Sequence, residues 1–150
     1  MTYTINALQL EDREQWQRLY YGYAEFYQVP MNQKILDQVW SWIFADDQPF
    51  YALIAKDEKG QAVGLMHYRG MPSPLRGATV GFLDDLYVDP NTRGSGVVDL
   101  MFERLQQQAK AHSWPFVRWI TAENNYRGRA VYDRLAEKTQ WQTYQLPAAK

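Results

Sequence analysis

Residues 78–113 constrain the fold more than any other part of the chain. The run ATVGFLDDLYV predicts a strand, DPN predicts a turn, and VVDLMFERL predicts a long helix that ends near Ser113. Gly94 and Gly96 stand between the strand and the helix. A strand, a glycine turn and a helix in this order gather unpaired backbone N–H groups at the positive end of the helix dipole. The stretch therefore predicts a sheet protein with an anion site, suited to phosphate or pyrophosphate, at the helix start.

Strand and helix patterns continue on both sides of this stretch. Strands are predicted at residues 3–8, 50–56, 61–69, 78–88, 115–121 and 141–146, and helices at 12–27, 31–44, 97–113 and 123–138. Two prolines and a glycine predict a loop at residues 71–77. Because the chain shows no repeat, linker or low-complexity stretch, we expect one α/β (α+β) domain over residues 1–150, with helices on both faces of the sheet.

Composition and charge limit the partners of the protein. The 150 residues are 46% apolar and 15% aromatic, which is enough for one core. Sixteen basic and 17 acidic residues leave a net charge of -1, without the basic patch typical of nucleic-acid binders. No run approaches the roughly 18 apolar residues of a membrane span, and the opening residues do not form a secretory leader. With no cysteine, the chain suits a reducing compartment, and we expect a cytoplasmic protein that binds neither nucleic acid nor membrane.

The glycine turn does not match the better-known phosphate loops. A Walker loop requires Gly-Lys-Ser/Thr, and a dinucleotide fingerprint requires a third glycine where Asp99 stands. Gly94 and Gly96 remove side chains that would keep a ligand away from the backbone. The same two glycines are equally explained by a tight turn without any ligand, so the surrounding residues have to decide.

Two longer phrases point to one family. LDDLYVDPNTRGSGVVDLM resembles the acyl-CoA-binding motif of the GNAT superfamily of N-acetyltransferases, with Asn91 in place of the usual Gln or Arg. TAENNYRGRAVYDRLAEKTQW resembles the Asn-x-x-Ala-x-x-x-Tyr helix of that family, through Asn125, Gly128 and Tyr132. The likeness covers nearly the whole chain and is closest to the small histone and polyamine acetyltransferase branch. It implies a single-domain, mixed and mostly antiparallel sheet flanked by helices on both faces.

The resemblance also implies a co-substrate and a set of contacts. Acetyl-CoA would lie with its pantetheine arm along the main chain of the motif strand and its pyrophosphate on the amides of the glycine turn. The implied cofactor-binding residues are Leu86, Tyr87, Val88, Arg93, Gly94, Ser95, Gly96, Val97, Val98, Asn125 and Gly128. We expect direct transfer of acetyl to a primary amine of a small molecule or peptide, no metal, and a homodimer. The alternatives are a non-catalytic acyl-CoA-binding regulatory module and a nucleotide-binding domain.

Transfer to an amine requires a base, because an ammonium group with a pKa near 10.4 has no lone pair for attack. Asp84 and Asp85 are the candidates, and strand alternation predicts that they point to opposite faces, which excludes the paired carboxylates of a glycosidase. By resemblance, Asp84 accepts the proton, usually through water, and Tyr132 gives the departing thiolate a proton or a hydrogen bond. Asp85 is alternatively structural, pairing with an arginine or capping backbone N–H groups, and Tyr132 is alternatively a core residue.

Several other residues invite a functional interpretation. Gly128 costs about 1 kcal/mol inside a helix and so predicts close approach by a ligand or a neighbouring backbone. His67 and His112 are the only histidines and do not form a ligand-spaced cluster, which favours satisfied or exposed side chains over a metal site. An aromatic set predicts core packing, with a pocket for a cationic amine as the alternative. Its members are Trp16, Tyr20, Tyr23, Phe26, Tyr27, Trp40 and Trp42.

Overall fold

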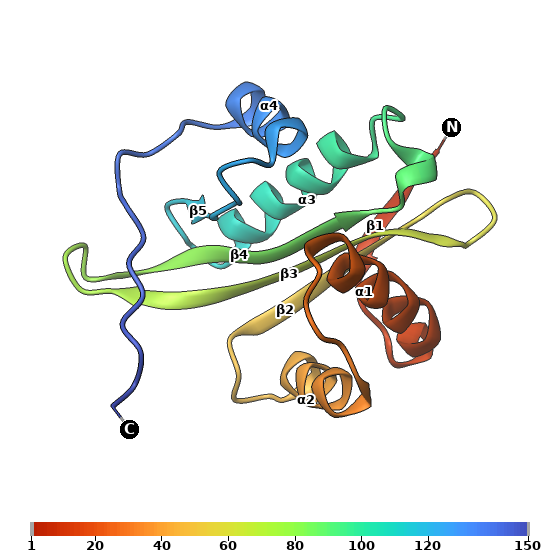
Figure 1. Ribbon diagram of the computed structural model, residues 1–150, viewed down its shortest axis with the longest axis horizontal. Coiled ribbons are helices and arrows are strands. Elements are labelled where there is room, and N and C mark those ends of the chain that lie inside the picture. Colours follow the sequence, from red (N-terminus) through yellow and green to blue (C-terminus); the bar gives the residue numbers. More distant parts are fainter. Residues whose placement is uncertain (1, 150) are drawn as a thin grey trace. The chain divides into compact units, whose positions relative to one another are not determined.

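The computed structural model describes residues 2–149 and contains the strands and helices labelled in Figure 1. The strands are β1 (Thr4–Ala7), β2 (Phe50–Lys56), β3 (Ala62–Ser73), β4 (Ala78–Val88) and β5 (Val117–Arg118). The helices are α1 (Arg13–Tyr27), α2 (Gln33–Phe44), α3 (Val97–Ala111) and α4 (Tyr126–Leu135), with short 3-10 turns at Leu10–Asp12 and Pro90–Thr92. The chain forms two compact units that meet in sequence at Trp119 and Ile120, and each is described by itself. That both belong to one domain stays a prediction.

The first unit contains one five-stranded sheet in the order β1-β2-β3-β4-β5. Neighbours from β1 to β4 are antiparallel, and β5 is parallel to β4. The β2–β3 hairpin closes through Gly60, whose φ of +78° suits glycine and whose N–H donates to Asp57 O at 3.0 Å. The predicted mixed, mostly antiparallel sheet is confirmed.

Helices cover both faces of this sheet, as predicted. Ile54 and Leu65 pack in one core cluster with Trp16 of α1 and Leu36 of α2. On the opposite face the missing side chain of Gly64 makes room for α3, because a Cβ there would lie 2.8 Å from the Met101 sulfur. Figure 1 shows α3 across the sheet from α1 and α2. Alternate residues of β2 and β3 therefore supply two cores, one on each side.

The β3–β4 hairpin is longer than predicted. Residues 71–73, expected in a loop, extend β3, and Pro72 lies opposite Thr79 of β4. β2 begins at Phe50, opposite Arg69, so the outer edge of β3 has no strand partner beyond that point. A proline is tolerated on such an unpaired edge because no ladder hydrogen bond is lost there.

The C-terminal predictions were wrong in their extent or their type. β5 has two residues where seven were expected, and α4 is shorter than residues 123–138. The predicted strand at 141–146 is not a strand, and Trp141 and Leu146 in it are 73% and 93% exposed. A strand needs a neighbour to accept and donate its backbone hydrogen bonds, and none of the described strands pairs with this segment.

Among the described residues, no helix is both long enough and apolar enough to cross a bilayer.

Candidate active site

One edge of β4 lacks a strand partner over most of its length. β5 pairs with β4 only at Gly81 and Phe82, so residues 83–88 are unpaired on that side within the first unit. The predicted pantetheine contacts, Leu86, Tyr87 and Val88, lie on this unpaired stretch. Free N–H and C=O groups on a sheet edge can bind an extended ligand in the manner of an added strand.

The unpaired edge leads into an open helix start. Gly94 and Gly96 have φ values of +78° and +90°, and a Cβ at either position would meet nothing within 4 Å. Gly96 is the N-cap of α3, and no side chain caps the helix. The first N–H groups of a helix have no acceptor within the helix, so those of α3 are available to an anion. The structure thus brings the predicted residues 93–98 together at this open helix start, where Arg93 N and Ser95 N already donate to Pro90 O and Thr92 O within the turn.

The turn itself is held by Asp89. Its carboxylate accepts from Asn91 N at 2.9 Å, and its carbonyl accepts from Thr92 N at 2.9 Å. The Arg93 guanidinium lies over the Phe26 ring of α1, with 5.9 Å between Cζ and the ring centroid. These contacts order the loop without using the amides at the start of α3.

Substitution of Gly96 tests the open turn. Gly96→Ala is expected to lower the free energy of unfolding by about 1–2 kcal/mol, because φ near +90° is strained for alanine. It should also weaken CoA binding several-fold, since the methyl group enters the space beside the amides. Gly60→Ala is the matched control, because Gly60 also has a positive φ with open space around it. Equal CoA affinity in the two variants, measured by calorimetry, would contradict a binding role for the turn.

A β-bulge determines where the two acidic side chains point. His67 pairs with Asp85 and Tyr68 pairs with Leu83, so Asp84 is an extra residue in β4. Arg69 Nε lies 3.1 Å from Asp84 Oδ2, and His67 Nδ1 lies 2.8 Å from Asp85 Oδ2. His67 and Arg69 are two residues apart on a regular strand and share a face. Both carboxylates therefore lie on that face, and the prediction of opposite faces was wrong because the bulge interrupts the alternation.

Asp85 is the end of a buried chain of hydrogen bonds. Trp16 Nε1 donates to His67 Nε2 at 2.9 Å, and the His67 side chain is fully buried. An indole N–H can only donate, so Nε2 is unprotonated and Nδ1 carries the proton that is donated to Asp85. Tyr20 Oη also donates to Asp85, at 2.8 Å. His67 is thus a satisfied histidine, one of the two alternatives predicted. No group of three metal-ligating side chains exists among residues 2–149.

The two acids have opposite pKa shifts. Burial raises the pKa of Asp85, but hydrogen bonds from His67, Tyr20 and Tyr23 outweigh it and the net pKa is lowered. Burial also raises the pKa of Asp84. The Arg69 guanidinium lowers this pKa and the Asp85 charge raises it further, so the net pKa of Asp84 stays above its usual value. Neighbouring groups with pKa values pushed apart are suited to different roles. Asp85 is suited to remain ionised as a structural anchor, and Asp84 is suited to accept a proton.

This assignment refines the predicted alternatives. Asp85 takes the structural part, but its partners are a histidine and tyrosines, and the arginine pairs with Asp84 instead. Asp84 Oδ2 is buried and forms no hydrogen bond of good geometry within the described chain. The Arg69 guanidinium is its charged partner, and a buried carboxylate oxygen without a hydrogen bond also favours a proton donor. Asp85 is held by its buried donors, and this engagement, not an orientation to opposite faces, excludes the paired carboxylates of a glycosidase.

Replacing Asp85 should move the pH dependence of the reaction. In Asp85→Asn the neighbouring negative charge disappears, so the pKa of Asp84 should fall and the acid limb of kcat/KM should shift to lower pH. Because the pKa of Asp85 is lowered in the folded protein, its ionised form stabilises the fold above about pH 3.9, and this stabilisation is lost as pH falls. The variant lacks this group, so its free energy of unfolding should depend less on acid pH. Reaction rates and urea unfolding, both measured as a function of pH, check these two expectations. If the acid limb of kcat/KM does not move in Asp85→Asn, the charge of Asp85 does not influence the pKa of Asp84.

The aromatic set divides between core and surface. Trp16 is fully buried, and Trp40 packs on it with ring centroids 5.0 Å apart. Burial and the Asp85 charge raise the pKa of Tyr20 and Tyr23, which therefore stay protonated as donors. Phe26 is 53% exposed and belongs to the surface. Core packing is thus confirmed for Trp16, while the hydrogen-bonding role of the tyrosines was not predicted.

The second unit contains the α4 motif. Asn125 is the N-cap of α4, where its Oδ1 accepts from Gly128 N at 3.3 Å and its Nδ2 donates to Thr121 Oγ1 at 2.9 Å. A Cβ on Gly128 would lie 2.5 Å from Asn125 Nδ2. The close neighbour of Gly128 is therefore this capping side chain, where a ligand or another backbone was expected. Tyr132 is half-buried in α4. Cofactor contacts of Asn125 and Gly128 stay a prediction.

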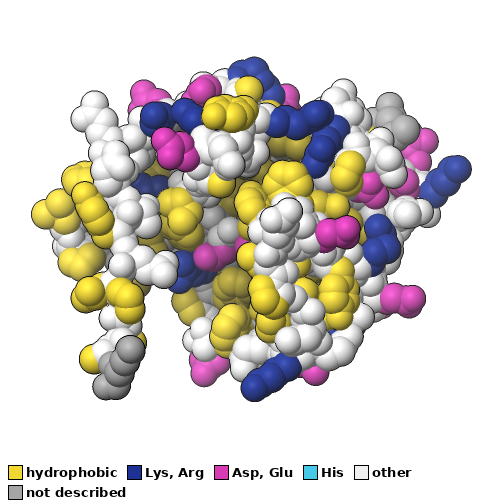
Figure 2. All heavy atoms as spheres, viewed as in Figure 1, with side chains coloured by type: hydrophobic (Ala, Val, Ile, Leu, Met, Phe, Trp, Pro, Cys, Tyr) yellow, Lys and Arg dark blue, Asp and Glu magenta, His cyan; other side chains and the backbone are white. Residues whose placement is uncertain are grey.

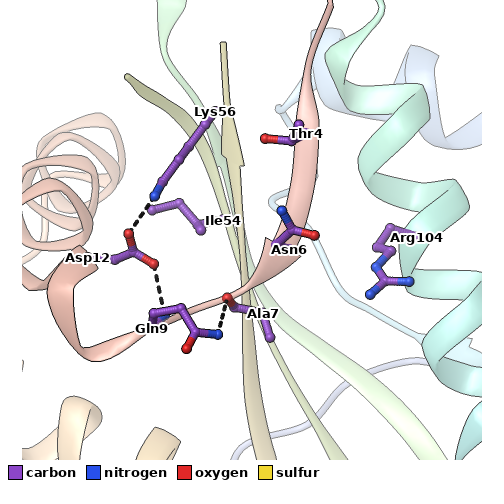
Figure 3. Close-up of a pocket in the computed structure, with 8 residues that line it drawn as sticks. All are labelled: Thr4, Asn6, Ala7, Gln9, Asp12, Ile54, Lys56 and Arg104. Atoms are coloured by element: carbon purple, nitrogen blue, oxygen red, sulfur yellow. Dashed lines mark hydrogen bonds and ion pairs between the residues drawn. The ribbon is translucent and has the colours of Figure 1, made fainter. Parts of the chain in front are cut away.

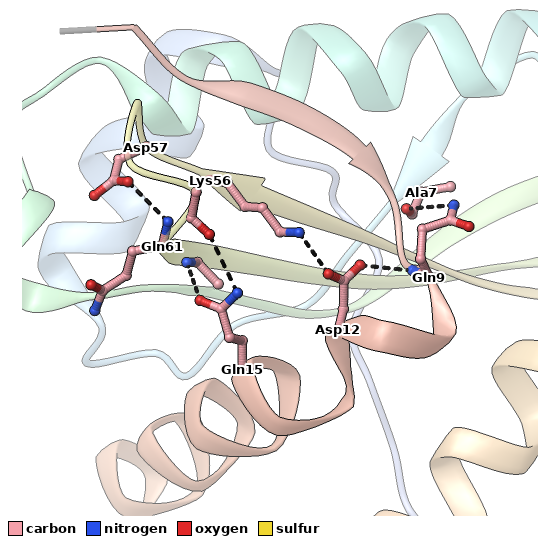
Figure 4. Close-up of polar contacts among 9 residues, drawn as sticks. Ala7, Gln9, Asp12, Gln15, Lys56, Asp57 and Gln61 are labelled. Carbon is pink, nitrogen blue, oxygen red and sulfur yellow. Dashed lines mark hydrogen bonds and ion pairs between the residues drawn. The ribbon is translucent and has the colours of Figure 1, made fainter.

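A separate hollow of about 400 Å³ lies beside β1 and is shown in Figure 3. Its lining residues are Thr4, Asn6, Ala7, Gln9, Asp12, Ile54, Lys56 and Arg104. Lys56 Nζ lies 2.6 Å from Asp12 Oδ1, and Asp12 Oδ2 accepts from Gln9 N. Figure 4 shows that these contacts, with Gln15, attach the start of α1 to the neighbouring strands. They explain how α1 is held, and no predicted site residue lines this hollow.

The surface charge agrees with the sequence. Figure 2 shows acidic and basic side chains interspersed with hydrophobic ones on the face in view.

Comparison with protein families and curated proteins gives a consistent result. A family model described as Acetyltransferase (GNAT) family matches residues 13–136, which include β4, the glycine turn and α4. The chain is also similar to D-amino-acid N-acetyltransferase HPA3 of Saccharomyces cerevisiae (strain ATCC 204508 / S288c). The two are 26% identical over 136 residues, which is 90% of this chain and 84% of that protein.

Solved structures share the fold. Aminoglycoside antibiotic 6'-N-acetyltransferase AAC(6')-Ih from Acinetobacter baumannii superposes with a TM-score of 0.82 at 16% identity, over 99% of this chain and 99% of that one. Ribosomal-protein-alanine N-acetyltransferase from Brucella melitensis biovar Abortus 2308 gives a TM-score of 0.79 at 23% identity, over 98% and 100%. At such identities these likenesses show the fold alone.

Proposed function

The chain belongs to the GNAT family of acetyltransferases and is an N-acetyltransferase, and from this premise we propose direct transfer of acetyl from acetyl-CoA to a primary amine of a small molecule or peptide. The observation that carries the proposal is the unpaired edge of β4 that leads into the uncapped start of α3. A phosphate-bearing chain with amide groups fits both parts, because the edge offers hydrogen bonds and the helix start favours negative charge.

Acetyl-CoA would be held mainly through backbone. In the proposal, the main chain of Leu86, Tyr87 and Val88 holds the pantetheine arm, and the amides of residues 93–98 hold the pyrophosphate. The open space beside Gly94 and Gly96 supports this, since no side chain occupies it. Asn125 and Gly128 are proposed as further contacts on α4. When bound, the co-substrate supplies an activated acetyl thioester.

The chemistry needs three proton transfers. Asp84 takes a proton from the substrate ammonium, directly or through water, and the free amine attacks the thioester carbonyl. A backbone N–H at or near Leu86 stabilises the oxyanion that forms. The carbon–sulfur bond then breaks, and Tyr132 gives a proton to the CoA thiolate. The attacking nitrogen loses a second proton to solvent as the amide forms, Asp84 returns its own proton to solvent, and no covalent enzyme intermediate forms.

Binding and turnover together test the proposal. We expect calorimetry to show binding of CoA and acetyl-CoA, and a thiol-release assay to show turnover with at least one member of an amine panel. CoA binding without turnover would favour a regulatory module. Protection against melting by ATP or NAD, but not by CoA, would favour a nucleotide-binding domain. The names of the similar proteins mention D-amino acids, aminoglycosides and a ribosomal-protein alanine, so the panel includes amino acids, aminoglycosides, peptides and polyamines.

Substitution of Tyr132 tests the acid. Tyr132→Phe is expected to lower kcat by about 10²-fold and to leave the KM for acetyl-CoA unchanged, because only the departing thiolate loses its proton donor. Tyr126→Phe, on the same helix and 74% exposed, is the matched control and should keep full activity. Undiminished turnover of the Tyr132 variant at every pH would remove this role.

We also propose a homodimer located in the cytoplasm. Trp141, Tyr144 and Leu146 are exposed apolar side chains in the second unit, and burial of such groups stabilises association. Sedimentation should then give twice the chain mass of 17.7 kDa. Fractionation of producing cells tests the location, which rests on the absence of cysteine in the sequence.

A further inference from the structure

Arg69 is an exposed cation within a buried stretch of β3. Residues 62–68 and Gly70 are buried, whereas the Arg69 side chain keeps 46% of its surface exposed. Arg69 also shares a sheet face with Asp84 and Asp85, as the register and the ion pairs above establish. A charged side chain that opens to solvent beside the proposed base is well placed to contact the acceptor.

The guanidinium is oriented but only partly used. Its Nε lies 3.1 Å from Asp84 Oδ2, and its Cζ lies 5.1 Å from the centroid of the Phe82 ring. These two contacts fix the plane of the group. Its two terminal nitrogens form no hydrogen bond to any residue from 2 to 149. A planar fork of N–H donors matches a carboxylate in a bidentate way.

We propose that Arg69 binds the carboxylate of a free α-amino acid whose amino group lies at Asp84, so that the acceptor is a zwitterion. This inference rests on the proposed function and names its substrate class. In an α-amino acid the ammonium and the carboxylate share one carbon atom, and in the protein the Asp84 carboxylate and the Arg69 guanidinium are also adjacent. The two charge pairs can lie side by side with opposite polarity.

The same pair discriminates against other amines. A polyamine would bring a second positive charge toward Arg69, which is unfavourable. An amine without a carboxylate would leave the terminal nitrogens of Arg69 without a charged partner when the substrate covers them. The rival explanation is that Arg69 only neutralises Asp84, and this predicts equal effects of its replacement on all amines.

The experiment compares amines that differ in the carboxylate. Initial rates of thiol release are measured for D- and L-alanine, alaninamide and putrescine, each at the optimal pH of the variant. The proteins are the wild type, Arg69→Gln, Arg69→Lys and the control Arg76→Gln. Arg76 is an exposed arginine that also lies over an aromatic ring, that of Phe116, but it is in the β3–β4 turn.

For the wild type, kcat/KM for one alanine enantiomer should exceed that for alaninamide by about 10-fold or more. Arg69→Gln should lower kcat/KM for alanine by about 10²-fold, mainly through KM, and that for alaninamide by less than about 3-fold. Arg69→Lys should be intermediate, because it keeps the charge but not the fork. Arg76→Gln should match the wild type.

Equal losses for alanine and alaninamide in Arg69→Gln would overturn the inference, as would a wild type that prefers alaninamide or putrescine. If no amine is acetylated, the proposed function fails. The carboxylate site is then tested by binding alone. Calorimetry of the CoA-loaded wild type with alanine supports the site if binding is lost in Arg69→Gln. Failure of the wild type to bind alanine overturns it.

Discussion

Asp84→Asn is expected to lower kcat/KM for every accepted amine by about 10²–10⁴-fold, while the affinity for CoA stays unchanged. Asparagine has nearly the shape of aspartate but cannot take a proton from the ammonium. The affinity for CoA should persist because the proposed cofactor contacts are backbone groups of β4 and the glycine turn. Asp46→Asn, in an exposed turn, is the matched control and should have wild-type rates.

The pH dependence gives a second readout for this residue. Asp84 must be ionised to act, and its raised pKa means that it is protonated at a higher pH than an ordinary aspartate. The acid limb of kcat/KM in the wild type should therefore lie above the usual range of a carboxyl group. In Asp84→Asn the remaining activity should not show this limb. A variant with wild-type rates across the pH range would show that another group removes the proton.

Trp16→Ala is expected to lower the free energy of unfolding by about 3–5 kcal/mol. The indole is fully buried and packs against Tyr20, Trp40 and His67. Alanine leaves a cavity, and it also leaves His67 Nε2 without its donor. Both effects act on the same buried centre, so the loss should be among the largest that a single substitution causes in this chain.

A second substitution separates packing from hydrogen bonding. Trp16→Phe keeps much of the ring and removes the N–H, so the loss should be about 1–3 kcal/mol. Trp42→Ala, at a side chain that is 41% exposed, is the control and should cost about 1 kcal/mol or less. Urea unfolding of the three variants provides the measurement. A cost for Trp16→Ala no larger than that of the control would show that the buried network does not stabilise the fold.

The sequence by itself determined the elements whose signals are local. Apolar periodicity located the first three helices, a turn motif located the β2–β3 hairpin, and the phrase from β4 to α3 located the open glycine turn. The positive φ values at Gly94 and Gly96 agree with their residue type, because glycine adopts this conformation without steric cost. Each of these features depends on residues close together in the chain.

Only the tertiary structure decided how the residues of the site face one another. One extra residue in β4 places Asp84 and Asp85 on the same face of the sheet. This bulge is defined by the register between β3 and β4, which the sequence of one strand alone does not reveal. The partners of Asp85, including Tyr20, are up to 65 residues away in sequence, and Arg69 was not predicted as a site residue. Residues 141–146 have the composition of a strand but no partner. Strand pairing and buried polar contacts are interactions between distant segments, so their outcome depends on the packed whole and not on local preference.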